Sequence, residues 1–158
     1  MSTILGLPAH ILLVHFIVVL APLTAVLAIV CALWPAARRR LTWLVVILAA
    51  VTVVLTPLTT SAGEWLENRT EGSPVLEEHA ELGDTMLYFS LSLLVAAILL
   101  ALIHLRESRQ RPLGSVITWI VAAVVILASA ATTVQVYRIG DSGARSAWGD
   151  KVAESSTG

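Results

Sequence analysis

The fold is decided by residues 11–40, which read ILLVHFIVVLAPLTAVLAIVCALWPAARRR. From Ile11 to Trp34 this stretch contains no Asp, Glu, Lys or Arg, and the basic run Arg38–Arg40 closes it. A helix needs about 20 apolar residues to cross the hydrocarbon of a bilayer. The stretch is too long for a signal peptide and no basic residue precedes it, so we predict a retained transmembrane helix.

Three more charge-free stretches follow, at 41–63, 85–105 and 112–137. The chain of 158 residues is 57% hydrophobic and 13% charged, with a mean hydropathy of +0.85, whereas soluble domains carry about 25% charged residues. Backbone groups inside lipid must find hydrogen-bond partners within their own segment, which favours helices. We therefore predict an all-α fold, a four-helix transmembrane bundle in a lipid bilayer, with short connections that give an up-down topology. We expect residues 1–148 to form one domain and 149–158 a flexible polar tail.

Basic residues predict the orientation of this bundle. The first connection carries Arg38–Arg40 and the third carries Arg106, Arg109 and Arg111, whereas the second connection is acidic. Cytoplasmic connections are enriched in basic residues, so both termini should be extracytoplasmic. Arginine outnumbers lysine nine to one and Ala, Val and Leu dominate, as is typical of a high-GC bacterial gene. We therefore expect the bacterial inner membrane.

The third helix is expected to begin before the membrane. Ser73 is a suitable N-cap, and Pro74 suits the first helical position. A helix from Pro74 to about Arg106 would be roughly 50 Å long, whereas the hydrocarbon is about 30 Å thick. The helix should therefore protrude by two or three turns on the outer side.

Several function classes are excluded by the sequence. The net charge of −1 gives no basic surface for a nucleic-acid partner, and one cysteine allows no internal disulfide. The sequence contains no phosphate-binding loop, no Ser-His-Asp pattern and no pair of catalytic carboxylates. Glu107, the acid in the third connection, suggests no chemistry. We expect no stand-alone catalytic activity.

Three of the four histidines lie toward the predicted outer side of the bundle. These are His10, His15 and His79, whereas His104 ends the third stretch on the opposite side. Ionisable side chains in membrane helices are costly and often mark functional sites. A histidine site near the outer face is therefore the main functional hypothesis.

One hypothesis is axial ligation of haem b. His10 or His15 would face His79 or Met86 across the bundle, since Met86 follows His79 by seven residues and shares its helix face. A b-type haem needs two such ligands on facing helices and an apolar slot between them. This arrangement would place the protein in an electron-transfer setting.

Two other interpretations stay open. His10, His79, Glu64 and Asp84 provide nitrogen and oxygen ligands that suit zinc or another divalent metal near the rim. Alternatively, the imidazoles are hydrogen-bonded structural groups in a non-catalytic accessory membrane protein.

The segment after the last apolar stretch also has two predicted arrangements. Arg138 and Arg145 could pair with Glu64, Glu78 or Asp84 and fold the segment over the mouth of the bundle. The alternative is a solvated segment, because exposed ion pairs are weak.

Four motifs in the same order resemble the DUF2231 family of membrane proteins. They are LPAHILLVHF at 7–16, AGEW at 62–65, EHA at 78–80 and VYRIGDSGA at 136–144. The resemblance implies a four-helix bacterial membrane protein. Some members of that family are joined to Rieske or cytochrome-like domains, so the resemblance also implies a redox or respiratory partner protein.

Overall fold

The computed structural model describes residues 3–4, 7–69 and 73–155. Its four helices are α1 (Ala9–Leu33), α2 (Pro35–Glu67), α3 (Pro74–Ser108) and α4 (Ser115–Ser155). Two short antiparallel strands, β1 (Thr3–Ile4) and β2 (Leu7–Pro8), precede α1. All four helices are long and apolar enough to cross a membrane, which confirms the predicted all-α transmembrane bundle.

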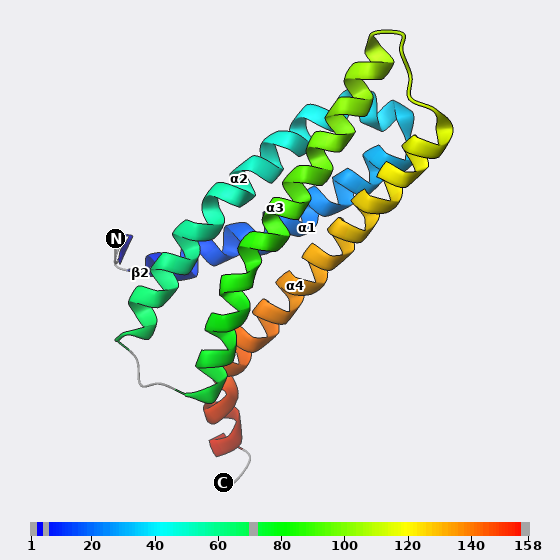
Figure 1. Ribbon diagram of the computed structural model, residues 1–158. Coiled ribbons are helices and arrows are strands. Elements are labelled where there is room, and N and C mark those ends of the chain that lie inside the picture. Colours follow the sequence, from blue (N-terminus) through cyan, green and yellow to red (C-terminus); the bar gives the residue numbers. More distant parts are fainter. Residues whose placement is uncertain (1–2, 5–6, 70–72, 156–158) are drawn as a thin grey trace.

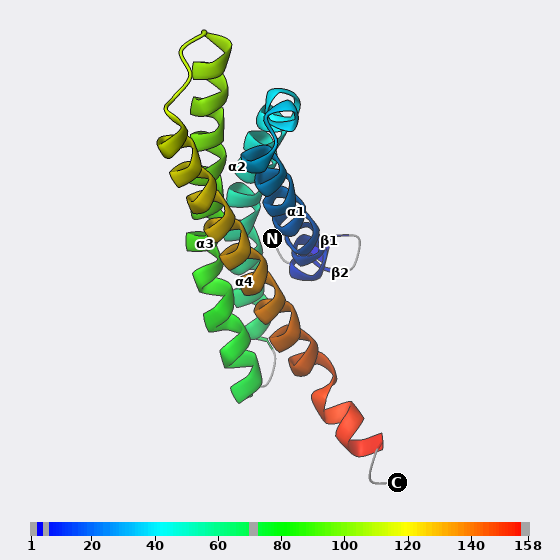
Figure 2. The ribbon, with the colours of Figure 1, turned by 90° about the vertical axis from the view of Figure 1, so that its right-hand side faces the viewer.

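Consecutive helices run antiparallel, which confirms the up-down topology (Figure 1). Each helix packs on its two neighbours in the order α1, α2, α3, α4 and back to α1, while α1 and α3 face each other diagonally with few contacts. The α1–α2 and α3–α4 connections share one end, here called the arginine end. His10 and His79 lie at the other end, here called the histidine end. The last turns of α4 extend beyond the other helices at the histidine end (Figure 2).

The helix boundaries follow from local sequence. Ser73 caps α3 as predicted, because the backbone N–H of Leu76 donates to its Oγ at 3.2 Å, and Pro74 is the first helical residue. α2 begins earlier than the apolar stretch because Pro35 suits a first helical turn, so Arg38–Arg40 lie in the helix and not in a loop. α4 likewise continues as helix beyond the apolar stretch, and the division of the chain at residue 148 stays a prediction.

The core consists of two clusters stacked along the bundle. The larger cluster lies toward the arginine end and is rich in alanine, including Ala28, Ala49 and Ala97. Small side chains let neighbouring helices approach closely, which is how membrane helices gain van der Waals contact. The smaller cluster lies toward the histidine end and joins Ile17, Ala21, Met86 and Val136.

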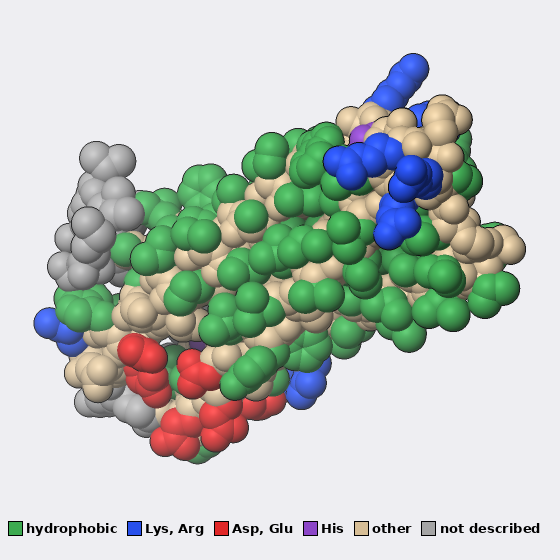
Figure 3. Space-filling model, turned by 45° about the horizontal axis from the view of Figure 1, so that its top comes forward, with side chains coloured by type: hydrophobic (Ala, Val, Ile, Leu, Met, Phe, Trp, Pro, Cys, Tyr) green, Lys and Arg blue, Asp and Glu red, His purple; other side chains and the backbone are tan. Residues whose placement is uncertain are grey.

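Apolar side chains cover the flanks of the bundle, whereas charges gather at its ends. Figure 3 shows acidic side chains at one end, arginines at the other and hydrophobic side chains between them. Phe16, Val54, Val95 and Leu127 are more than half exposed on these flanks. Such a surface fits lipid and would be costly in water.

One buried ion pair ties three helices together at the arginine end. Arg38 is 3% exposed, and its Nη2 and Nε donate to the two carboxylate oxygens of Glu107 at 2.7 and 3.3 Å. Its Nη1 donates to the carbonyl oxygens of Cys31 and Ala32 at 3.0 and 3.3 Å, at the C-terminal end of α1. The sequence suggested no role for Glu107, but the structure gives it a structural role as the partner of Arg38.

Candidate functional site

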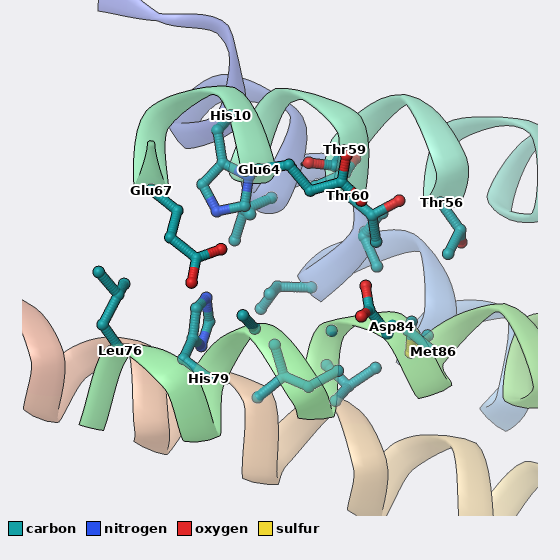
Figure 4. A pocket seen from close by; sticks show the side chains of 18 residues that line it. His10, Thr56, Thr59, Thr60, Glu64, Glu67, Leu76, His79, Asp84 and Met86 are labelled. Carbon is teal, nitrogen blue, oxygen red and sulfur yellow. Dashed lines mark hydrogen bonds between the residues drawn. The ribbon is translucent and has the colours of Figure 1, made fainter. Parts of the chain in front are cut away.

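A cavity of about 130 Å³ opens at the histidine end between all four helices. Figure 4 shows its polar side chains, and the walls between them are mostly apolar. The polar residues that line it are His10, Thr56, Thr59, Thr60, Glu64, Glu67, His79 and Asp84. Met86 closes the cavity on its apolar side and is buried.

His10 lies in the first turn of α1 and is held against α2. Its Nδ1 lies 2.9 Å from the carbonyl oxygen of Thr59. A carbonyl oxygen only accepts hydrogen bonds, so Nδ1–H donates to it and Nε2 is the ring nitrogen left to bind another group. Gly63 makes this packing possible, since a Cβ there would lie 3.0 Å from the His10 ring.

His79 lies in the early turns of α3 and is held against α4 in the same way. Its Nδ1 lies 3.0 Å from Oγ of Ser142, and that hydroxyl donates to the carbonyl oxygen of Ile139 at 3.0 Å. Because the Ser142 hydroxyl uses its proton in the bond to Ile139, it can only accept from Nδ1–H of His79. Nε2 of His79 is therefore the nitrogen that keeps a lone pair. A Cβ at Gly143 would lie 2.9 Å from this ring, closer than real contacts allow.

The two imidazoles face each other across the cavity. Their ring centroids are 6.3 Å apart and their planes are nearly perpendicular, at 86°. Figure 4 shows the Glu67 carboxylate pointing toward the space between the rings, with the Asp84 carboxylate beside Met86. Two nitrogen lone pairs and several carboxylates around one partly apolar cavity make a site that attracts a cation.

Five of the six residues singled out in the sequence line this cavity. His10, His79, Met86, Glu64 and Asp84 are among the lining residues. His15 is not, because its exposed side chain lies on another face of α1 and its Nδ1 bonds to the carbonyl oxygen of Ile11 at 2.5 Å. Five residues turn a helix by about 140° beyond full turns, so His10 and His15 cannot share a face.

The predicted cofactor sites fit this cavity to different degrees. In the described part of the chain, no three His, Cys, Asp or Glu side chains lie close enough to form a ready-made metal site. Pockets for drug-sized ligands measure about 300–1,000 Å³, so a haem needs more room than the cavity of about 130 Å³ offers. The carboxylates around the cavity also oppose the anionic propionates of a haem.

Sequence reasoning missed the residues that hold the two histidines in place. Thr59, Gly63, Ser142 and Gly143 position the rings, and Glu67 adds a carboxylate to the cavity. Gly63 and Gly143 lie within the AGEW and VYRIGDSGA motifs, and these motifs were the sequence signal that could have pointed to them.

α4 lines the cavity with Val136 and Ile139, and its Ser142 holds the His79 ring, whereas its arginines do not contribute. Arg145 pairs with Asp141, one turn earlier on α4, and Arg138 is exposed. Neither arginine is paired with the acidic residues named from the sequence within the described part of the chain.

Four lipid-compatible helices with polar ends define a multi-pass integral membrane protein. The chain belongs to the DUF2231 family of predicted membrane proteins, whose family model matches residues 6–156. The resemblance drawn from the four motifs is thereby confirmed. Among curated proteins and solved structures, none matches the chain.

Proposed function

We propose that this membrane protein binds a divalent transition-metal ion between His10 and His79. The observation that carries the proposal is the matched anchoring of the two rings. Each Nδ1 is engaged by a protein oxygen, and each ring leaves Nε2 to one shared cavity. Metal-binding histidines are usually held this way, with one nitrogen on the metal and the other N–H on an oxygen acceptor.

The surrounding groups suit a cation of borderline softness. Neutral imidazole nitrogens are good ligands for zinc, copper, cobalt and nickel. The carboxylates of Glu64, Glu67 and Asp84 line the same cavity and supply compensating negative charge. Because two imidazoles alone do not complete a coordination shell, water or one of these carboxylates would occupy the remaining positions.

Metal titration of the purified protein tests this proposal. The protein is stripped with a chelator in mild detergent, and Zn²⁺ affinity is measured by competition with a chelating dye. His10→Ala and His79→Ala should each weaken binding at least about tenfold, since even partners one step removed from a metal matter that much. His15→Ala is the matched control, because it removes an imidazole from the same helix outside the cavity. Equal affinity in all four proteins would refute the site.

A haem b centre in an electron-transfer setting is the second candidate, and one observation favours it. His10 and His79 would hold the haem iron, since their rings lie on opposite helices with centroids 6.3 Å apart. A helix movement that widens the cavity would be required. A dithionite-reduced spectrum without a Soret or alpha band, after expression with haem supplied, would remove this candidate and the redox partner that goes with it.

We also propose that the protein lies in the bacterial inner membrane with both termini outside the cytoplasm. Five arginines at the arginine end stay outside the Arg38–Glu107 pair, and basic connections favour the cytoplasm. The histidine cavity would then open toward the extracytoplasmic side. Alkaline phosphatase fused after residue 158 should be active in cells, and an inactive fusion would reverse the orientation.

A further inference from the structure

The arginine end carries a concentration of positive charge that the fold does not use. Arg38 is neutralised by Glu107. The remaining arginines at this end are exposed and form no ion pair within the described part of the chain. They are Arg39, Arg40, Arg106, Arg109 and Arg111. This surface therefore has several guanidinium groups outside any ion pair, and the carboxylate of Glu107 at this end is engaged by Arg38.

An unusual aromatic pair lies one helical turn below two of these arginines. Trp43 on α2 is 52% exposed, and its ring meets the His104 ring of α3 edge to face at 6.5 Å and 89°. Nδ1 of His104 is buried without a hydrogen-bond partner among the described residues. Arg39 and Arg40 precede Trp43 by four and three residues and share its side of α2.

The chemistry of this place fits the headgroup of a phospholipid. Guanidinium groups bind phosphate oxygens strongly, and an indole ring lies well at the level of the headgroups. Ile47 follows Trp43 by four residues on the same side of α2 and is 59% exposed, which offers an apolar path for an acyl chain. Basic pockets between membrane helices are suited to anionic headgroups.

We propose that the α2–α3 surface at the arginine end, where Arg39 and Arg40 lie beside the Trp43–His104 ring pair, binds an anionic phospholipid. The phosphate lies against the two arginines, the Trp43 ring packed on His104 lies at the level of the headgroup, and an acyl chain follows Trp43 and Ile47. This site is separate from the histidine cavity and stands whether or not that cavity binds a metal.

Native mass spectrometry with added lipid tests the proposal. The full-length protein is released from detergent with equal amounts of phosphatidylglycerol and phosphatidylcholine, and the retained lipid is counted. The wild type should retain the anionic lipid preferentially. Arg39→Gln/Arg40→Gln should lose about fivefold in affinity for each arginine removed, with an unchanged thermal midpoint.

The control is Arg109→Gln/Arg111→Gln, which removes the same charge from the α3–α4 connection, away from Trp43. That variant should keep the preference for phosphatidylglycerol. If both double variants lose the preference equally, a general charge attraction explains the binding and the proposed lipid site is refuted. Equal retention of both lipids by the wild type, or displacement of the lipid by millimolar inorganic phosphate, would refute it as well.

Discussion

Replacing Arg38 should destabilise the bundle more than replacing the arginine next to it. Arg38 is 3% exposed and makes four hydrogen bonds, two to Glu107 on α3 and two to carbonyl oxygens at the end of α1. Arg38→Met removes all four and leaves the Glu107 carboxylate without its cation. Arg39→Met removes an exposed cation that has no ion pair within the described residues.

The expected size of the effect follows from burial. Removing one partner of a buried ion pair costs about 3–5 kcal/mol. Glu107 keeps a side-chain exposure of 27%, so solvent can partly hydrate its charge. We therefore expect Arg38→Met to lower the free energy of unfolding by about 3 kcal/mol, at the low end of that range. Arg39→Met should change it by less than about 0.5 kcal/mol.

The charge pair itself can be separated from the helix-end contacts by a double-mutant cycle. Glu107→Leu alone leaves a buried guanidinium, whereas Arg38→Met/Glu107→Leu leaves no unpaired charge. The double variant should therefore be more stable than the sum of the single losses, by about 1–3 kcal/mol. Unfolding is followed by helicity in mixed micelles with increasing sodium dodecyl sulfate. Equal losses for Arg38→Met and Arg39→Met, or strict additivity in the cycle, would refute this account.

Three further predictions concern the histidine end. Gly143→Ala should weaken Zn²⁺ binding about tenfold, because its Cβ would lie 2.9 Å from the His79 ring. Gly140→Ala on the same helix adds a Cβ with no atom within 4 Å, so this variant should bind Zn²⁺ like the wild type. Ser142→Ala removes the acceptor that holds His79 Nδ1 and should also weaken Zn²⁺ binding about tenfold with unchanged helicity. An unchanged affinity would mean that the hydroxyl does not orient the ring. Gln135→Leu removes the hydrogen bonds from Nε2 of Gln135 on α4 to the carbonyl oxygen of Leu82 and to Oγ1 of Thr85 on α3, at 3.1 and 2.8 Å. It should lower the free energy of unfolding in the micelle assay by about 0.6–1.7 kcal/mol, whereas Thr133→Ala at an exposed position should not change it.

The number of helices and their order could be predicted because the bilayer imposes a length on each span. Charge-free stretches of about 20 residues have no other common explanation. The start of α3 was predictable for a local reason, since an N-cap serine and a following proline act within one turn. Both kinds of inference depend on residues that are close in sequence.

The partners of single charged and aromatic residues could not be predicted in this way. Arg38, Arg39 and Arg40 are equivalent in the sequence, and Arg38 is distinguished by a partner 69 residues away. His10 and His15 both belong to α1, and the rotation of α1 against α2 decides which of them faces the cavity. That rotation is set by tertiary packing of small residues such as Ala21 and Ala28.

The histidine end is where the bundle would gain most from a bound cation. α1 and α3 lie diagonally and share few direct contacts, yet each contributes one imidazole to the cavity. The core cluster at this end is the smaller of the two, whereas the arginine end has the alanine-rich cluster and the Arg38–Glu107 pair. A cation in this partly apolar space would interact favourably with two imidazole nitrogens and with the carboxylates that line the cavity. A ligand that binds only the folded state adds its binding free energy to the stability of that state. A metal between His10 and His79 would therefore join the diagonal helices at the end where packing alone holds them least.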